Sequence, residues 1–335
     1  MSVDLKVRIT SWNCRGLQKT KKVKQVMNRI KILQSKIVFL QETHLTHEDE
    51  LKVRRRWKGK ILSAPFTSQA RGVMILIHDF IPLQIHQVIK DKAGRYLIIQ
   101  GTILREQLIL INIYAPNTDE PKFFQNLFLT IASLPGACIM AGDFNCTLDP
   151  QKDKSSGVDQ SHSRSRGVIH HFMKEMSLID VWREDNPNGK KYSCYSGTHQ
   201  SYSRIDFFLV SAQLKYKIKE VSYDAILLSD HAPNSLVYHD PKLTSDVPKW
   251  RFKTKWLADA GFVTYLDEQI KYYFETNTIE TSQSTRWEAF KAFIRGQIIN
   301  ITSFNAKETY NKTKSVRLSR CPTKITFVKN TKLLL

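Results

Sequence analysis

Several apolar, strand-like segments in the first 240 residues end on their carboxyl side in short polar side chains. The segment "ACIMAGDFN" shows this most clearly, because its apolar run ends in Asp143 and Asn145. Side chains alternate faces along an extended chain, so these two point the same way and Phe144 points the other. Sheet proteins often build their sites at such strand ends, where a rigid scaffold positions polar groups.

The same pattern recurs along the chain. Polar residues close or precede four other apolar segments: Asn13, Glu42, Asn112 with Tyr114, and the run Ser229, Asp230 and His231. Each residue alone is weak evidence, since a lone strand-end Glu is usually solvated and a lone His is usually structural. Taken together, these residues predict a functional site at the strand ends.

Apolar periodicity predicts many strands separated by a few helices. Strands are expected at residues 5–12, 36–43, 72–78, 82–89, 95–103, 107–116, 138–145 and 203–211, with another following the loop that begins at Ser229. Helices are expected at residues 20–35, 120–136 and 167–183, with a loop at 150–166. This mixture favours an α/β sandwich, in which helices flank two packed mixed sheets, over a barrel.

The composition changes near residue 241. The stretch "DPKLTSDVPKW" reads as a linker. Two stripes at helical spacing follow it and predict packing faces: Phe262, Leu266, Ile270 and Tyr273, then Trp287, Phe290, Ile294 and Ile298. We therefore expect a catalytic domain at 1–240, a helical segment at 241–309 and a basic, disordered tail at 310–335.

The formal net charge is +20 in 335 residues. Such a surplus repels itself unless a polyanion neutralises it, so nucleic acid is the leading partner class, against the alternative of a generic basic surface. The five cysteines form no CxxC pair, and no stretch resembles a signal peptide or a membrane span. We expect reduced thiols in a nuclear or cytoplasmic protein that is not secreted and engages no membrane.

The candidate residues suit one kind of chemistry. Carboxylates with oxygen-bearing neighbours suit a hard cation such as Mg²⁺. A His beside an Asp can act as a base or bind phosphate as a cation. Asp206 opens a Phe-rich strand and needs a partner, for which His231 and Arg204 are the candidates. These are the parts for attack of water on a phosphodiester.

Six motifs occur together in a recognisable order: "SWNCRG", "LQETHL", "NIYAPN", "AGDFN", "SRIDFFLVS" and "SDHAP". Over about residues 5–240 the chain resembles the endonuclease/exonuclease/phosphatase superfamily, the group of DNase I, exonuclease III and the apurinic/apyrimidinic endonucleases. Within it, the chain looks most like the endonuclease domain of a LINE-type retrotransposon polyprotein of a fish or amphibian. The resemblance implies a four-layer α/β sandwich that cleaves double-stranded DNA with Mg²⁺ or Mn²⁺, leaves a 3′-hydroxyl and needs no small-molecule cofactor.

The resemblance also implies roles for matched positions. Glu42 and Asn13 are expected to bind the metal, with Asp230 assisting. Among the catalytic residues, His231 polarises the phosphate and Asp206 orients His231. Asp143 activates water or protonates the leaving oxygen, and both roles stay open. Tyr114 and Asn145 are expected to hold the phosphate. The residues expected to contact DNA are Ser193, Ser229, Arg164, Arg166 and Arg204, beside a groove-probing hairpin between Ser193 and Asp206.

Two other functions compete with this one. Another superfamily activity, such as abasic-site repair, RNA deadenylation or inositol-lipid phosphatase action, would use the same motifs, although the +20 charge argues against the last. The third is a catalytically inactive nucleic-acid-binding remnant. The chain has no Asp-Asp pair of the kind a reverse transcriptase carries, so we expect a truncated copy of an element.

Overall fold

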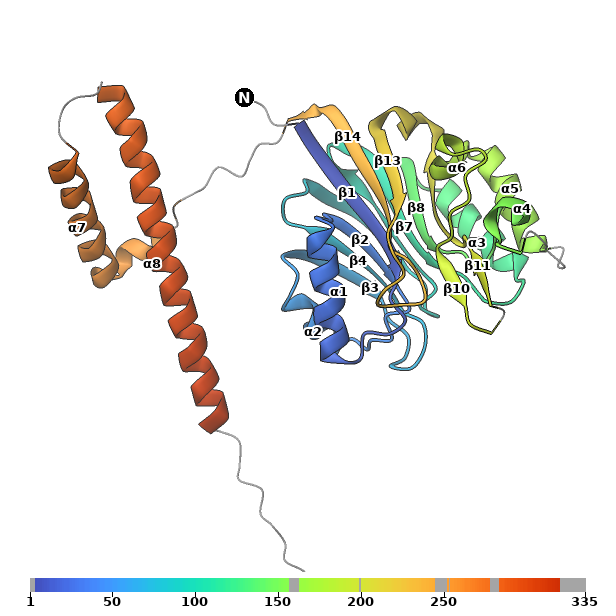
Figure 1. Cartoon of the computed structure of the whole chain (residues 1–335), viewed down its shortest axis with the longest axis horizontal. Helices are drawn as coiled ribbons and strands as arrows, with labels where there is room; N and C mark the ends of the chain where they lie inside the picture. Colours follow the sequence, from blue (N-terminus) through green and yellow to red (C-terminus); the bar gives the residue numbers. More distant parts are fainter. Residues whose placement is uncertain are drawn as a thin grey trace, which may run out of the picture. The chain divides into compact units, whose positions relative to one another are not determined.

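The computed structural model describes residues 4–156, 163–198, 200–244, 252, 254–277 and 283–319. The chain divides into two compact units, residues 1–249 and 250–335 (Figure 1). Each unit is described by itself.

Two six-stranded mixed sheets form the first unit. The first sheet has the order β13-β14-β1-β2-β4-β3. Its strands are β1 (Asp4–Asn13), β2 (Ile37–Gln41), β3 (Gly59–Ala64), β4 (Val73–His78), β13 (Ile218–Tyr223) and β14 (Asn234–Thr244). The second sheet has the order β5-β6-β7-β8-β12-β9. Its strands are β5 (Leu83–Lys90), β6 (Tyr96–Ile103), β7 (Glu106–Tyr114), β8 (Ala137–Asp143), β9 (Leu178–Asp180) and β12 (Asp206–Ser211).

Helices cover the outer faces of both sheets, which completes four layers (Figure 1). The helices beside the first sheet are α1 (Thr20–Ile32) and α2 (Glu50–Arg54). Those beside the second are α3 (Pro121–Ala132), α4 (Pro150–Asp153), α5 (Arg164–Glu175) and α6 (Val181–Asp185). A 3₁₀ helix, η1 (Ala212–Lys217), and a small hairpin, β10 (Cys194–Ser196) with β11 (Ser201–Ser203), complete the unit. The predicted α/β sandwich is confirmed.

Three apolar clusters hold these layers together. The central cluster fills the space between the sheets and includes Ile9, Phe39 and Phe208. One outer cluster packs α1 onto the first sheet, and the other packs α3 and α5 onto the second. Every residue of β2 is buried, because α1 covers one face of the strand and the second sheet covers the other.

Several short elements differ from the sequence prediction. The segment 167–183, predicted as one helix, contains the end of α5, the strand β9 and the start of α6. Asp180 breaks the helix because its side chain caps α6 by accepting from the Arg183 amide. The predicted loop at 150–166 contains α4 and the first turn of α5, while residues 157–162 lie outside the described part. The linker expected at 240–250 overlaps β14, because this strand continues to Thr244.

The second unit is helical. It contains η2 (Thr254–Ala258), α7 (Ala260–Thr276) and α8 (Gln283–Ser319). The two predicted stripes meet, since the Tyr273 ring lies 5.3 Å from that of Phe290 and 5.2 Å from that of Phe293. Helix α8 continues into the segment predicted as a disordered tail from residue 310, and residues 320–335 lie outside the described part. Within the described residues, no helix is both long and apolar enough to cross a membrane.

Gly142 is required by the close approach of β8 to β7. Its φ is +149°, and a Cβ added there would lie 1.9 Å from the carbonyl oxygen of Ile113. Since backbone atoms cannot move away without breaking the parallel pairing of these strands, only glycine fits directly before Asp143.

We predict that Gly142→Ala destabilises the protein by at least about 2 kcal/mol, because it adds both steric overlap and backbone strain. Gly167→Ala is the matched control, since nothing lies within 4 Å of its added Cβ and it sits in α5. The control should stabilise slightly, as Ala favours helix. Urea denaturation of the full chain measures both, and equal effects would contradict the prediction.

Candidate active site

Polar side chains from both sheets meet at one edge of the sandwich. In the first sheet β1 and β2 run parallel, so Asn13 lies opposite Gln41 and beside Glu42, the next residue. In the second sheet Asp143 pairs with Tyr114 of β7 and with Asp206 of β12. The parallel and antiparallel registers together place these strand ends side by side, as the sequence predicted.

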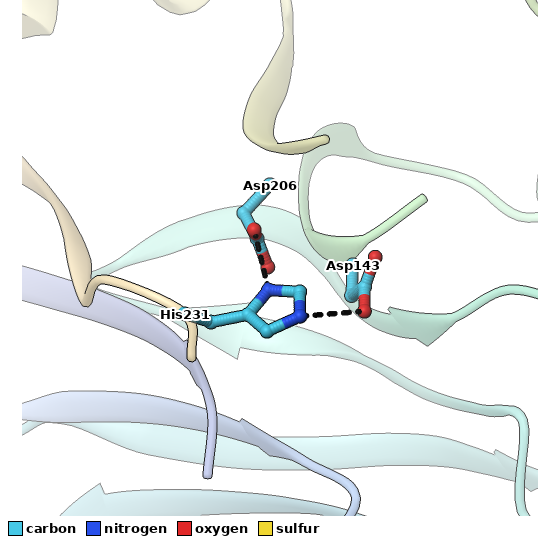
Figure 2. Close-up of side chains that lie close together, drawn as sticks. All are labelled: Asp143, Asp206 and His231. Atoms are coloured by element: carbon cyan, nitrogen blue, oxygen red, sulfur yellow. Dashed lines mark hydrogen bonds and ion pairs between the residues drawn. The ribbon is translucent and has the colours of Figure 1, made fainter. Parts of the chain in front are cut away.

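A line of hydrogen-bonded and ion-paired groups ends at Asp143. The Ser193 hydroxyl donates to Asp206 Oδ2 over 2.7 Å. The same oxygen lies 2.8 Å from His231 Nδ1, and His231 Nε2 lies 3.7 Å from Asp143 Oδ2 (Figure 2). The imidazole is therefore held between two carboxylates, one from β12 and one from β8.

Backbone contacts fix His231 in this position. Trp12 Nε1 donates to the carbonyl oxygen of His231 over 3.0 Å, which ties the loop before β14 to β1. His231 also forms an isolated antiparallel bridge with Cys194, at the base of the β10–β11 hairpin. The imidazole is thus positioned by both sheets and by the hairpin.

Burial and charge shift the pKa values of this group. Burial alone would lower the pKa of His231, but Asp206 and Asp143 more than offset it and hold that pKa well above its ordinary range. Burial raises the pKa of Asp143 to about 7, and Asp206 adds to this, while His231 and Asn13 oppose it. A carboxyl with this pKa exchanges its proton at neutral pH, which suits acid–base catalysis.

Asn13 joins the two halves of the site. Its Nδ2 donates to Glu42 Oε1 over 3.1 Å and to Asp143 Oδ2 over 2.9 Å. Its Oδ1 accepts from the Arg15 amide, which fixes the amide nitrogen toward the carboxylates. Asn13 therefore orients the expected metal ligand Glu42 and the expected proton carrier Asp143 at the same time.

Glu42 itself sits in a strained loop. Its φ is +48°, in the left-handed region that few non-glycine residues adopt. The Tyr114 hydroxyl hydrogen-bonds Glu42, and burial together with that carboxylate raises the pKa of Tyr114. His44 Nε2 lies 3.6 Å from Glu42 Oε2. Such strain persists only where the surroundings impose it, and it is concentrated at functional sites.

The donors present could hold a metal ion. Asp143, Asp206 and His231 each offer a ligand atom, and these atoms lie within 4.8 Å of one another. Both ring nitrogens of His231, however, already face carboxylates. The Glu42 side chain is 20% exposed, against 2% for those of Asp143 and Asp206, so of these three carboxylates Glu42 is the most accessible to an ion from solvent.

The remaining expected catalytic and metal residues lie at the rim. Asn145 has a φ of +47° and donates from Nδ2 to the carbonyl oxygen of Ala115, while its amide donates to Asp143 Oδ1. Asp230 is paired with Arg15 at 2.7 Å and accepts from the Ser229 hydroxyl. Its carboxylate is thus engaged by a cation and is not part of the Asp143–Asp206–His231 group.

Two expected DNA contacts are corrected by burial. Ser193 is 0% exposed, and its hydroxyl serves Asp206. Arg204 is also 0% exposed and forms ion pairs with Asp153 at 2.8 Å and Asp180 at 2.7 Å. Neither side chain has surface to offer DNA. The sequence missed Asp153 and Asp180 because they sit in segments predicted as a loop and a helix, where nothing nearby in the sequence pointed to Arg204 as their partner.

The other expected DNA contacts differ in accessibility. The Arg164 side chain is 79% exposed, 3.8 Å from Asp119. Arg166 donates from Nε to the carbonyl oxygen of Thr147 and is partly buried. The expected hairpin exists as β10 and β11, and the exposed rings of Tyr195 and Tyr202 lie 4.7 Å apart on it.

A further residue, Asn112, ties the two sheets together below the site. Its Nδ2 donates to the carbonyl oxygens of Leu40 and Met74, and its Oδ1 accepts from Gln41. Asn112 belongs to β7, whereas its partners belong to the first sheet. In the sequence, the indication of such a role was an amide side chain within an otherwise apolar strand.

Comparison with known proteins shows which family the sequence matches. The model of the "Endonuclease/Exonuclease/phosphatase family" matches residues 10–231. The chain is 29% identical over 263 residues to the "Transposon TX1 uncharacterized 149 kDa protein" of Xenopus laevis, covering 76% of this chain. It spans only 20% of that protein. It is 25% identical over 268 residues to an exodeoxyribonuclease of Bacillus subtilis, covering 69% of this chain and 99% of the relative.

The fold is also that of a solved nuclease structure. The AP endonuclease LMAP from Leishmania major superposes with a TM-score of 0.59 at 17% identity, covering 70% of this chain and 88% of that one. This likeness shows the shared sandwich.

We predict that Asp206→Asn lowers the pKa of His231, because Asp206 is the largest of the influences that raise it. NMR titration of the imidazole in metal-free protein measures the change. Asp185→Asn is the control, since it removes an exposed carboxylate paired with Lys215. An unchanged His231 pKa in Asp206→Asn would contradict the assigned contact.

We predict that Arg204→Met costs about 3–5 kcal/mol of stability, since it removes the cation paired with buried Asp180 and leaves buried Asp153 with Arg183 as its remaining ion-pair partner. Arg164→Met should leave stability within about 0.5 kcal/mol, because its side chain is mostly solvated. Thermal or urea unfolding compares the two. A stable Arg204→Met protein with weakened DNA affinity would restore Arg204 as a DNA contact.

Proposed function

The chain belongs to the endonuclease/exonuclease/phosphatase family, and from that membership we propose that it is a Mg²⁺-dependent endonuclease that nicks double-stranded DNA. Family membership indicates a hydrolase of phosphodiesters. The similarity to a transposon protein over 76% of the chain supports a role in retrotransposition, where a nick leaves a 3′-hydroxyl. The +20 charge supports a nucleic-acid substrate over a small molecule.

One observation carries the proposal: the unbroken series of contacts from Glu42 through Asn13 and Asp143 to His231 and Asp206. It places a solvent-accessible carboxylate, a carboxyl with pKa about 7 and a charged imidazole at one strand-end edge. A merely structural cluster would have no reason to keep Glu42 in a left-handed backbone conformation facing solvent.

Glu42 would hold the divalent cation, with Asn13 orienting its carboxylate and Tyr114 donating to it. Bound there, Mg²⁺ would neutralise charge that develops on the phosphate oxygens. Carboxylate and hydroxyl oxygens are the ligands that this hard cation prefers.

The chain's own residues handle the protons. His231, kept charged by Asp206 and Asp143, can donate from Nε2 to a phosphate oxygen while Nδ1 stays bonded to Asp206. Water attacks phosphorus, and the bond to the 3′ oxygen breaks. Asp143 in its ionised form can take the proton of that water, and in its protonated form can give one to the leaving oxygen; a pKa of about 7 makes both forms available.

Exposed groups at the rim would hold the duplex. Arg164 offers a cation for backbone phosphates, and the hairpin offers the Tyr195 and Tyr202 rings. Ser229 and Asp230 lie beside Arg15 at the same rim.

We predict that the chain relaxes supercoiled plasmid with Mg²⁺ and fails to do so in EDTA. His231→Ala and Asp143→Ala should each lower the nicking rate at least about 100-fold, the usual contribution of general acid–base groups. Glu42→Ala should lower activity and raise the Mg²⁺ concentration needed for it. Gel assay of the nicked circle gives the rates.

His47→Ala is the matched control, because the His47 side chain is 75% exposed and lies outside the site. It should nick at the wild-type rate. Wild-type nicking by folded His231→Ala protein would refute the site. Faster cutting of a duplex with one abasic site than of an intact duplex would move the assignment to a repair endonuclease, and DNA binding without cleavage would indicate an inactive remnant.

A further inference from the structure

A second strongly basic surface lies on the first sheet, at the opposite end of β1 and β2 from the active site. Two adjoining hollows mark it, with volumes of about 700 Å³ and 580 Å³. Each is lined by five Lys or Arg side chains, and Lys31 and Lys36 line both. We call the two together the basic groove.

The sheet register arranges these cations in a row. Lys36 follows Arg8 across the sheet, since its amide donates to the Arg8 carbonyl oxygen. His78 comes next, and Gly59, preceded by Lys58, pairs with His78. On the other side Arg8 pairs with Val237, which pairs with Glu220 beside Lys219. The row therefore crosses all the strands of the first sheet.

The row has the length of a short nucleic-acid segment. Five strand spacings of about 4.8 Å give about 24 Å. Phosphates of a stacked strand advance about 3.4 Å each, so the row matches about seven nucleotides. Arg8 lies five residues before Asn13 on β1, or about 17 Å along the strand, so this surface is separate from the catalytic edge.

The cations of the groove have no carboxylate partner in the part of the chain that the structure describes. Among the described residues, none of its Lys or Arg side chains forms an ion pair with a carboxylate, and the groove's acidic lining residue is Glu220. Burial lowers the pKa of His78, and Lys36 and Lys58 lower it further while Asp79 opposes them, so the positive field reaches the groove floor.

The shape of the groove favours a flexible strand over a rigid duplex. Its cations line two successive hollows between α1 and the sheet, and Trp57, partly exposed and edge-on to His78 at 5.6 Å, lies in one of them. Grooves that bind single strands combine tracking cations with an aromatic ring in this way. A compact anion would need cations converging on one point, whereas these are spread along a line.

We propose that the basic groove binds the sugar–phosphate backbone of a single nucleic-acid strand, separately from the duplex at the active site. The protein would then hold two nucleic acids at once, one at each end of the first sheet.

The test uses the full chain in EDTA with fluorescent twelve-nucleotide single strands of DNA and RNA, a twelve-base-pair duplex, and polyglutamate. Lys31→Gln/Lys36→Gln should weaken binding of a single strand about 25-fold at 0.1 M salt and reduce its salt slope by about 1.4, at about 0.7 per phosphate contact. Lys122→Gln/Lys174→Gln is the matched control, with the same charge loss on exposed lysines of α3 and α5.

Plasmid nicking by Lys31→Gln/Lys36→Gln in Mg²⁺ should equal that of the wild type and shows that the variant is folded. If that variant does not fold, Lys24→Gln/Lys58→Gln, at two exposed groove lysines, carries the same expectations. Equal losses in the groove and control variants would overturn the proposal. The proposal would also be overturned if the groove substitutions weakened binding of the duplex alone, or if polyglutamate bound as tightly as the single strands. A lower nicking rate in a folded groove variant would overturn it as well.

Discussion

The hydrogen bonds of Asn13 hold the catalytic edge together. Asn13 ends a strand of the first sheet, yet one of its amide hydrogens reaches Asp143 in the second. The other reaches Glu42, so a single side chain sets the separation of two acidic groups. Asn112 makes a second tie below it, from β7 to the strands β2 and β4. The site therefore exists only while the two sheets keep one relative position, which the apolar cluster between them enforces.

A buried ionic group supports the same site from behind. Asp153 receives both Arg204 and Arg183, and Arg204 also reaches Asp180. Arg204 stands two residues before Asp206, directly after the β10–β11 hairpin. Buried charges are costly unless paired and hydrogen-bonded, so the network fixes where the hairpin ends and where β12 begins. Asp206, and through it His231, takes its position from that junction.

The sequence predicted most long elements and which strand ends carry neighbouring polar side chains. Period-two and continuous apolar runs identified β1, β2, β4, β7, β8 and β12, because each buries enough apolar side chains to leave a pattern. The short elements α2, β3 and β9 were missed, since they are too short or too irregular for such a pattern. Asp143, Asp206 and His231 were found from strand-end position and motif.

Residue roles that depend on distant partners could not be read from the sequence. Arg204 looked like a surface cation because its partner Asp153 lies 51 residues earlier. Ser193 looked like a DNA contact because nothing nearby showed that its hydroxyl would face Asp206. In both cases tertiary packing decided between a solvated and a buried side chain, and local sequence carries no record of that choice.

The burial of Asp143 also has a consequence for the stability of the metal-free protein. Its carboxyl has a pKa of 3.8 in an ordinary setting and about 7 in the fold, so the folded state holds a proton that the unfolded chain releases. The raised pKa of His231 acts in the same direction. Both contributions to stability are complete in acid and are lost as pH rises through the folded-state pKa values. The candidate site thus makes the metal-free fold less stable toward alkaline pH, and a cation bound at the carboxylates would oppose that loss: the groups proposed to carry out hydrolysis also limit the alkaline stability of the fold that holds them.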